Sequence, residues 1–493
     1  MVDIHDSTGA GVTTAKAVLA LVALLFVSYP LYALYLHPLR DYPGPKVSAI
    51  SRIPYWVACL RGGQVRHMTR LHRKYGPVVR FAPNDVSYAD GQAWKDIAGV
   101  QKGKKENGKE VRFHAPSANG TPNLITENNQ ERHAAIRRVF SPAFSEKALK
   151  AQEPMFIKYA DLMVRNGRNA GTVNVTELLN FTTFDIMAEL AFGDSLGLLE
   201  KGAYSSWVAT VFNTVKVLPM IQMIEFYPIL RKTFALIEPK SITAMRLDHF
   251  NHTVTRVEKR LEEGSDKPDL WNLVEQSNTL TMEEMYNNAE LFMTAGTETT
   301  GTPTASLLTG LTYYLLANPD KKRILTEEVR RRFQSNEDIT FEGLAGLEYL
   351  NACLKEGLRV YPSIPSAIPR EIADGGNIVL GKWLPGGTRQ ISGKFVLNEY
   401  AKTNPDEFVP ERWLGDPEYK DDNREAHQPF SIGPRNCLGM NMAWHEMRLL
   451  LGKLLYNFDI DSDVGPEWRD QNVYVIWDLQ TTIFAASDRL HYA

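Results

Sequence analysis

The pattern of apolar and polar positions changes character along the chain. An uncharged apolar run extends from Ala17 to Leu36. From about residue 130 to about residue 360, apolar residues recur mainly at the spacing of amphipathic helices. Residues 363–400 instead contain short runs rich in Ile, Pro and Gly, which are typical of strands and turns, and a further helix is expected after Gly439. The pattern predicts a mostly α-helical fold with a small β region.

Local start and stop signals place several shorter elements. We expect a helix over Gln64–Tyr75 that stops at Gly76-Pro77. Strands over Val78–Phe81 and Val86–Tyr88 should then form a hairpin. Loops are expected where polar, Gly and Pro residues cluster, at residues 103–129, Asn166–Gly171 and Glu263–Asp269.

The longest predicted helix begins at Thr281. Residues Thr281–Glu284 form a capping box, in which the Thr and Glu side chains each bond a backbone N–H of the other residue. The helical pattern continues toward Asn318-Pro319. Pro303 should kink this helix, because it cannot donate a hydrogen bond to the carbonyl of Thr299. Another helix should end near Val360.

The apolar run Ala17–Leu36 is long enough to cross a membrane. At 1.5 Å per residue it would span about 30 Å, the thickness of a bilayer's hydrocarbon core. A cleaved signal peptide would have a shorter apolar region and a small-residue cleavage site, whereas this run ends in Leu34, Tyr35 and Leu36. A buried core helix is the other alternative. The run favours a retained transmembrane anchor.

The charges beside this run predict its orientation. Lys16 is the only Lys or Arg before it, whereas Arg40, Lys46 and Arg52 follow it. By the positive-inside rule, the bulk of the chain then lies in the cytosol. No Gly/Ser-rich or Pro-rich linker interrupts the chain beyond about residue 50. We therefore expect a short lumenal N-terminus (1–16), an anchor (17–36), a Pro-rich hinge (37–50) and one large domain (51–493).

Composition narrows the possible partners. The formal net charge of -3 gives no basic field that would attract nucleic acid. Hydrophobic residues make up 44% of the chain, enough for a large core and a sizeable apolar ligand. The three cysteines, Cys59, Cys353 and Cys437, match neither a disulfide framework nor a metal-finger spacing. Reduced thiols are expected, and Cys59 and Cys353 should be small buried hydrophobes.

The strongest chemical signal is the stretch Phe430–Gly439, with the sequence FSIGPRNCLG. It places Cys437 just before a helix, where backbone N–H groups and the positive end of the helix dipole stabilise a thiolate. Gly433 and Gly439 allow a tight turn and a close approach of the backbone to a flat ligand. Arg435 supplies a cation suited to a carboxylate.

The pattern F-x-x-G-x-R-x-C-x-G in this stretch resembles the haem-binding loop of the cytochrome P-450 superfamily. The resemblance extends over nearly the whole chain from residue 17. Haem ligated by a Cys thiolate, which favours O–O bond cleavage, is typical of that superfamily. The resemblance implies a single P-450-type domain that binds haem b (iron protoporphyrin IX). It further implies Cys437 as the axial ligand, Arg435 as a propionate contact, Phe430 as a shield of the sulfur, and Gly439 as part of the cofactor-binding loop.

The stretch Ala295–Thr300, AGTETT, lies midway along the long helix. Gly within a helix costs about 1 kcal/mol of stability relative to Ala, so a reason for Gly296 is expected. The close approach of a ligand, which a side chain would block, is such a reason. An acid followed by a hydroxyl, as in Glu298-Thr299, can relay protons to dioxygen. The structural alternative is a Thr hydroxyl bonded to a helix carbonyl. The stretch is similar to the superfamily's oxygen-binding helix, which implies that Ala295 and Gly296 lie beside the cofactor.

Two other motifs resemble the superfamily. Glu356 and Arg359 lie three residues apart on one helix face. Alone, such a pair is usually a weak surface salt bridge. In the superfamily it is buried and completed by an Arg of a later loop, whose place Arg412 takes here. That resemblance implies a structural role.

The second motif is His133-Ala134-Ala135-Ile136-Arg137, which stands where the superfamily usually has Trp-x-x-x-Arg. The resemblance implies that Arg137 binds a haem propionate and that His133 is a second donor. As bare sequence, Arg137-Arg138 is more often a solvated helix face. Arg370, after Pro369, matches another propionate-binding position.

These resemblances imply a monooxygenase that hydroxylates or epoxidises an apolar small molecule with O2 and electrons from NADPH. No Gly-rich dinucleotide or flavin motif stands in a strand–turn–helix context, so an NADPH-dependent cytochrome P-450 reductase is the expected partner. The expected location is the endoplasmic reticulum membrane, with a single span and a cytosolic catalytic domain. Residues Leu71–Arg80 and Asn180–Asp185 look like fungal enzymes of secondary metabolism. The candidate pocket segments are the loop around 103–125, Trp207–Leu236 and Ser363–Ile368. Their Phe, Met and Ile residues favour a terpenoid or polyketide-like ligand, although core packing explains the same residues equally well.

Two other functions are compatible with the same motifs. An isomerase or dehydratase of this fold would rearrange an oxygenated substrate without external O2, but it needs no proton relay, and Glu298-Thr299 argues against it. A non-enzymatic haem carrier or sensor would require a closed or saturated sixth site.

Overall fold

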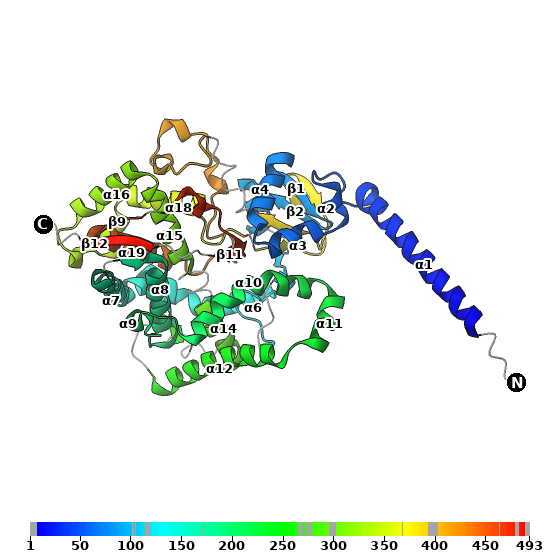
Figure 1. Cartoon of the computed structure of the whole chain (residues 1–493), viewed down its shortest axis with the longest axis horizontal. Helices are drawn as coiled ribbons and strands as arrows, with labels where there is room; N and C mark the ends of the chain where they lie inside the picture. The colour runs from blue at the N-terminus through cyan, green and yellow to red at the C-terminus, as the bar shows by residue number, and fades with distance from the viewer. Residues whose placement is uncertain are drawn as a thin grey trace.

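The computed structural model describes residues 7–100, 103, 105–113, 119–170, 172–264, 270–271, 274, 279–294, 302–366, 368–392, 403–462, 464–478 and 483–488. Helices form most of the body, and short strands lie mainly near the N-terminal side (Figure 1). This architecture confirms the predicted fold class. The helices are α1 (Ser7–Leu31), α2 (Lys46–Ile50), α3 (Ile53–Leu60), α4 (Gln64–Tyr75), α5 (Gly91–Ala98), α6 (Gln130–Phe140), α7 (Glu146–Ala170), α8 (Val175–Phe192), α9 (Leu198–Lys201), α10 (Ser206–Phe226), α11 (Pro228–Ile237), α12 (Lys240–Glu263), α14 (Met282–Thr294), α15 (Thr302–Leu316), α16 (Pro319–Arg332), α17 (Phe341–Ala345), α18 (Glu348–Val360) and α19 (Met440–Asn457).

The strands form small sheets. They are β1 (Val78–Ala82), β2 (Asp85–Tyr88), β3 (Gly108–Lys109), β4 (Thr172–Asn174), β5 (Arg370–Glu371), β6 (Asn377–Val379), β7 (Lys382–Leu384), β8 (Arg389–Ser392), β9 (Phe458–Asp461), β10 (Val473–Tyr474), β11 (Ile476–Trp477) and β12 (Ile483–Asp488). The largest described sheet has the order β1-β2-β8-β5-β3, and only β2 and β8 pair in parallel within it. The pairing of β3 with β5 places Lys109 directly opposite Arg370.

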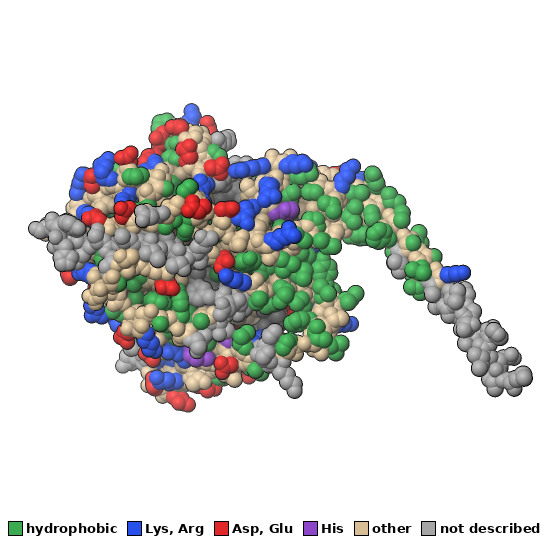
Figure 2. Space-filling model, viewed as in Figure 1, with side chains coloured by type: hydrophobic (Ala, Val, Ile, Leu, Met, Phe, Trp, Pro, Cys, Tyr) green, Lys and Arg blue, Asp and Glu red, His purple; other side chains and the backbone are tan. Residues whose placement is uncertain are grey.

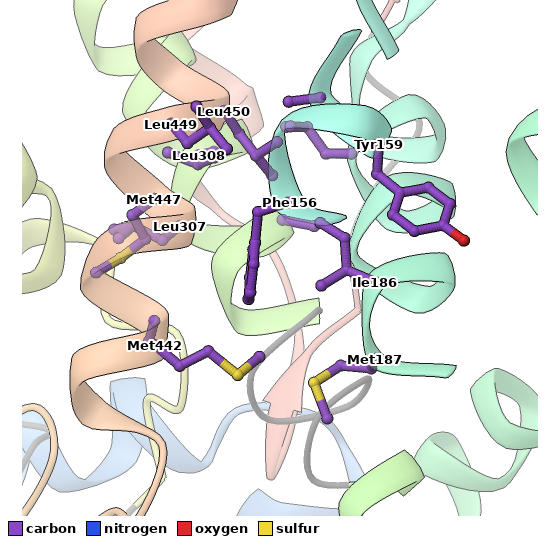
Figure 3. Close-up of a cluster of buried hydrophobic side chains, with 14 of the residues drawn as sticks. Phe156, Tyr159, Ile186, Met187, Leu307, Leu308, Met442, Met447, Leu449 and Leu450 are labelled. Carbon is purple, nitrogen blue, oxygen red and sulfur yellow. The ribbon is translucent and has the colours of Figure 1, made fainter. Parts of the chain in front are cut away.

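The main core lies where α7, α8, α15 and α19 pack together. Buried side chains from these four helices meet there, among them Phe156, Met187, Leu308 and Leu450 (Figure 3). Because α19 begins directly after the predicted cysteine loop, this packing fixes the position of that loop relative to α15.

Several local predictions are confirmed. Helix α4 has the predicted bounds, and β1 and β2 form the predicted hairpin. The capping box is present: the Thr281 N–H donates to Glu284 Oε2 at 2.9 Å, and the Glu284 N–H donates to Thr281 Oγ1 at 3.3 Å. Pro303 lies in the first turn of α15, where a Pro costs no helical hydrogen bond. The predicted kink concerns residues 295–301, which lie outside the described part of the chain.

The loop predicted at Asn166–Gly171 is wrong, because α7 continues to Ala170. Gly167 explains the error. A Cβ at this position would lie 2.9 Å from the ring of Phe458, so Gly permits α7 to pack closely on β9. Tertiary packing therefore extends the helix through a segment whose composition favours a loop. Of the loop predicted at Glu263–Asp269, residues 265–269 lie outside the described residues.

The segment predicted as a hinge is packed against the body. Leu39 is buried, and the Arg80 guanidinium donates to the carbonyls of Ala33 at 3.0 Å and Ala49 at 3.5 Å. Before it, α1 and a π-helical turn (Tyr32–Leu36) project away from the body (Figure 1). Within the described residues, one helix, Lys16–Leu36, is apolar and long enough to cross a membrane; a signal sequence would meet the same criterion.

Candidate active site

A mostly apolar cavity lies between α6, α14, α15, α19 and the loop before α19. It contains about 1370 Å³ of space not filled by atoms, part of it open to solvent. Cys437 and Phe430 contribute to one wall, and Leu291 and Phe292 of α14 also line it. The cavity therefore offers a large apolar space beside a single cysteine.

The cysteine loop is held by backbone contacts. The Cys437 N–H donates to the Phe430 carbonyl at 2.9 Å. Gly433 has φ +78°, and a Cβ there would overlap the Ala98 carbonyl oxygen, so only Gly fits. Gly439 has φ -87° and is the N-cap of α19. No protein contact in the described residues requires Gly at this position, and its predicted proximity to a flat ligand stays a prediction.

The three cysteines lie in different surroundings. Burial raises the pKa of Cys59 to about 12 and also raises the pKa of Cys353 well above its usual value, so both are protonated, inert thiols. Cys437 is only partly buried and lies near Arg137. Burial lowers the pKa of the Arg137 guanidinium, whereas the negative charge of Cys437 raises it. Of the three, Cys437 is the one placed to act as a thiolate.

Two of the predicted propionate ligands bond protein groups. Arg137, on α6, donates to the carbonyl of Asn436 at 2.8 Å and to its side-chain oxygen at 2.7 Å. Arg435 donates to a carboxylate oxygen of Glu106 at 2.7 Å and to the Glu127 carbonyl at 2.5 Å. Both arginines line the cavity, and they also fasten the cysteine loop to its neighbours.

His133 and Arg370 meet these arginines in a buried cluster that also contains Lys109. Burial, followed by the charges of Arg435 and Lys109, lowers the pKa of His133 to about 3. Burial and then Arg435 lower the pKa of Arg370 to about 10. Burial, Arg370 and Arg435 lower the pKa of Lys109 well below its usual range. We call Lys109, His133, Arg137, Arg370 and Arg435 the cationic cluster.

The cationic cluster fits a dianionic ligand. Lys109 and Arg370 face each other on paired strands, and like charges in this position are destabilising. Glu106 is the carboxylate that opposes them, and Lys109 forms no ion pair with any described residue. The two propionates of a haem would supply the missing negative charge, while the apolar cavity would hold the ring and Cys437 would stand at the iron. The residues present therefore fit the group.

The second predicted cluster, Glu356, Arg359 and Arg412, is fully buried. Arg359 donates to both carboxylate oxygens of Glu356, at 2.8 and 2.7 Å, and Arg412 approaches Glu356 at 3.4 Å. Asp422 pairs with the other side of Arg412. The Trp413 indole N–H also donates to Glu356, at 2.9 Å. This network joins α18 to the segment 403–422 and does not reach the cavity.

Sequence reasoning missed three residues of the site. Lys109 and Glu106 lay in the loop predicted as a candidate pocket segment, but no local signal singles out these two residues or links them to Arg370 or Arg435. Glu446 had a signal: it lies on the apolar face of α19, between Met442 and Leu450. Its carboxyl accepts a hydrogen bond from Thr304, a cavity residue, at 2.9 Å, and burial raises its pKa to about 8.

The remaining predicted residues, Ala295, Gly296, Glu298 and Thr299, lie outside the described residues. The flanking residues do line the cavity, with Phe292 on one side of the gap and Thr304 on the other.

Comparison with known proteins gives one family. The family model for Cytochrome P450 matches residues 45–478. The chain is 41% identical over 466 residues to the cytochrome P450 monooxygenase efuB of Hormonema carpetanum, with 91% of each chain covered. It is 42% identical over 464 residues to the cytochrome P450 monooxygenase FUM2 of Gibberella moniliformis, covering 91% of this chain and 97% of the relative. It is 38% identical over 461 residues to an averantin hydroxylase of Dothistroma septosporum, covering 91% of this chain and 86% of the relative.

The similarity spans the helical body, the cysteine loop and the cavity together. On these grounds the chain belongs to the cytochrome P450 family and is a haem-thiolate monooxygenase similar to fungal enzymes of secondary metabolism.

Proposed function

We propose that the protein is a membrane-anchored monooxygenase that hydroxylates or epoxidises an apolar secondary metabolite, with haem b as its cofactor. The observation that carries this proposal is the juxtaposition of Cys437, the apolar cavity and the cationic cluster. When bound, the haem would supply the activation of O2. Electrons come from NADPH through a separate cytochrome P-450 reductase that docks near the Cys437 face.

Each cluster residue has a distinct part in holding the cofactor. Beside the cluster, Cys437 would bind the iron through its thiolate, and Phe430 would shield the sulfur from water. Lys109 and Arg370 bind propionate oxygens, because they are the cations that the protein leaves least compensated. His133 is neutral at pH 7, since its pKa is about 3, and it donates one ring N–H. Arg137 and Arg435 add propionate contacts while they hold the loop.

Glu298 and Thr299 deliver protons to dioxygen. Their stretch continues from Phe292 and precedes Thr304, and both of these residues line the cavity. The Thr299 hydroxyl donates the proton, and the Glu298 carboxyl replaces it from solvent. Ala295 and Gly296 present little side-chain bulk, so a flat cofactor could approach the chain closely at these positions.

The substrate is an apolar terpenoid or polyketide. The cavity wall supports this class, because it is built mainly from Leu, Ile, Phe and Met side chains. One relative is named for the hydroxylation of averantin, a single small molecule. Among the described residues, few polar groups reach the cavity away from the cationic cluster, so binding would depend mainly on shape and apolar area.

The anchor places the enzyme on the cytosolic face of the endoplasmic reticulum membrane. Residues 17–36 form the span, and a second apolar surface lies on α11, where Ile229, Leu236 and Ile237 are at least 73% exposed. Figure 2 shows hydrophobic side chains gathered over α10–α11 and the base of α1. A chain that begins at Tyr42 should leave the integral-membrane fraction. If it resists carbonate extraction as the full chain does, the anchor lies elsewhere.

The experiment that tests the reaction class is the coupling of NADPH use to product in Thr299→Ala. The variant keeps a good helix former, so the fold and the thiolate spectrum should survive. It should consume NADPH, release peroxide and form much less oxygenated product per electron pair. Thr297→Ala and Thr300→Ala serve as controls. Turnover without NADPH would show an isomerase, and unchanged coupling in Thr299→Ala would refute the role of Thr299.

A further inference from the structure

Two neighbouring asparagines fasten one wall of the cavity to α14. Asn287 and Asn288 are both fully buried. The side-chain amide of Asn287 donates to the Asn119 side-chain oxygen at 2.7 Å and to the Thr121 carbonyl at 2.8 Å. The side-chain oxygen of Asn288 accepts from the Leu124 N–H at 2.9 Å. Three groups of the segment 119–124 are therefore bound by two adjacent residues of one helix.

These bonds lie one helical turn before the residues of α14 that line the cavity. Leu291 and Phe292 follow Asn288 by three and four residues, so they lie on the same helix face. Leu124, whose N–H is bound by Asn288, lines the cavity from the opposing segment. The contact thus sets the spacing between two apolar walls of the cavity.

Removing one partner of a buried amide hydrogen bond is costly, because the other partner loses its bond and is still shielded from water. If Asn288 is truncated, the Leu124 N–H stays buried without a partner, because Leu124 itself is 6% exposed. The segment can regain a partner only by moving toward water. Truncation of Asn287 removes two further bonds to the same segment, those to Asn119 and Thr121. Loss of either asparagine should therefore displace or loosen the wall rather than leave it in place.

We propose that Asn287 and Asn288 are positioning residues that hold segment 119–126 against α14, and thereby set the size of ligand that the cavity accepts. The inference rests on the proposed function only in assigning the cavity to an apolar substrate. Neither side chain lines the cavity, so both act through Leu124 and its neighbour Ile125.

The first arm of the test is hydrogen–deuterium exchange of the full-length holoenzyme, followed by mass spectrometry of peptides that cover 119–126. The matched control is Asn457→Ala. Asn457 is also a buried helical Asn, and its amide donates to the carbonyl four residues earlier at 2.8 Å, as that of Asn288 does at 2.7 Å. Asn288→Ala should speed exchange about five- to thirtyfold in this segment, and Asn457→Ala should leave it unchanged.

The second arm compares a small and a large nitrogen ligand, imidazole and 4-phenylimidazole, by spectral titration of the same holoenzymes. Asn287→Ala and Asn288→Ala should each change the ratio of the two Kd values by about fivefold or more. Asn457→Ala should leave the ratio unchanged. Unchanged exchange at 119–126, or an unchanged Kd ratio in both variants, overturns the proposal.

The two arms also separate this inference from the proposed function. Neither arm uses O2 or NADPH. Wild-type enzyme that forms no oxygenated product, combined with altered exchange and ligand ratio in the variants, would reject the monooxygenase reaction and keep the positioning role. If the chain did not bind haem, the exchange arm, carried out on the full-length chain as isolated, would still decide the inference.

Discussion

Two of the buried charged clusters among the described residues, the Glu356 network and the cationic cluster, differ in how their charges are balanced. In the first, Glu356 accepts hydrogen bonds from Arg359 and Arg412, and Asp422 completes the set, so two acids face two bases. In the cationic cluster, four formal cations and one neutral His meet a single paired carboxylate, that of Glu106. A balanced cluster is part of the fold, whereas an unbalanced one requires a ligand to complete it.

The origin of the side chains explains this difference. Glu356 and Arg359 share one turn of α18, so half of the first network forms with the helix itself. In the cationic cluster, Lys109 lies on β3 and Arg370 on β5. His133 and Arg137 lie on α6, and Arg435 lies in the cysteine loop. Its members repel one another as the fold assembles. Removing one residue from each cluster should therefore have effects of opposite sign.

The largest expected effect is that of Glu356→Ala. The change leaves Arg359 and Arg412 buried without their carboxylate, which should cost roughly 3–5 kcal/mol of folding free energy. Thermal unfolding and the yield of haem-loaded protein measure this loss. The control is Glu327→Ala, whose exposed pairs with Arg323 and Arg331 should contribute only about 0–1 kcal/mol. Normal thermal stability of Glu356→Ala would mean that the network is dispensable.

The second prediction concerns Lys109→Met, which removes one cation from the unbalanced cluster. The haem-free protein should be unchanged or stabilised by about 1 kcal/mol, because repulsion with Arg370 is relieved. Haem should nevertheless leave faster, since a propionate partner is lost; transfer to apomyoglobin measures the rate.

A matched control is Lys453→Met. Lys453 is also buried, but Asp161 pairs with it at 2.5 Å. This variant should destabilise the haem-free and haem-loaded forms alike. If Lys109→Met behaves in the same way as Lys453→Met, the cationic cluster is structural and the comparison between the two clusters fails.

The third prediction concerns Glu446, a buried carboxyl with no ionic partner among the described residues. Its pKa is raised to about 8, so the folded protein holds a proton that the unfolded chain releases above about pH 4.3. Stability contributed by this group is therefore lost as pH rises from about 4.3 to about 8. Glu446→Gln should reduce the difference in Tm between about pH 5.5 and about pH 8.5. An unchanged difference would show that Glu446 is not protonated in the folded protein.

Motif spacing within one segment predicted the cysteine loop, with Cys437 just before α19. The propionate-binding positions Arg137, Arg370 and Arg435 and the burial of the Glu356–Arg359 pair were instead implied by the family resemblance. Lys109 was missed because its relevance depends on the pairing of β3 with β5, and no local pattern specifies that pairing. The Asn287–Asn288 contact was missed for the same reason, since the asparagines alone do not reveal which loop they bind.

The measurement that tests the account most directly is the carbon monoxide difference spectrum of the reduced protein. Cys437 should give the red-shifted Soret band of thiolate-ligated haem in the wild type. Cys353→Ala is the control and should keep this band, because Cys353 is a buried, protonated thiol away from the cavity. Cys437→Ser should lose it. A red-shifted band that persists in Cys437→Ser, or that is absent from haem-loaded wild-type protein, would contradict the assignment of Cys437 as the ligand.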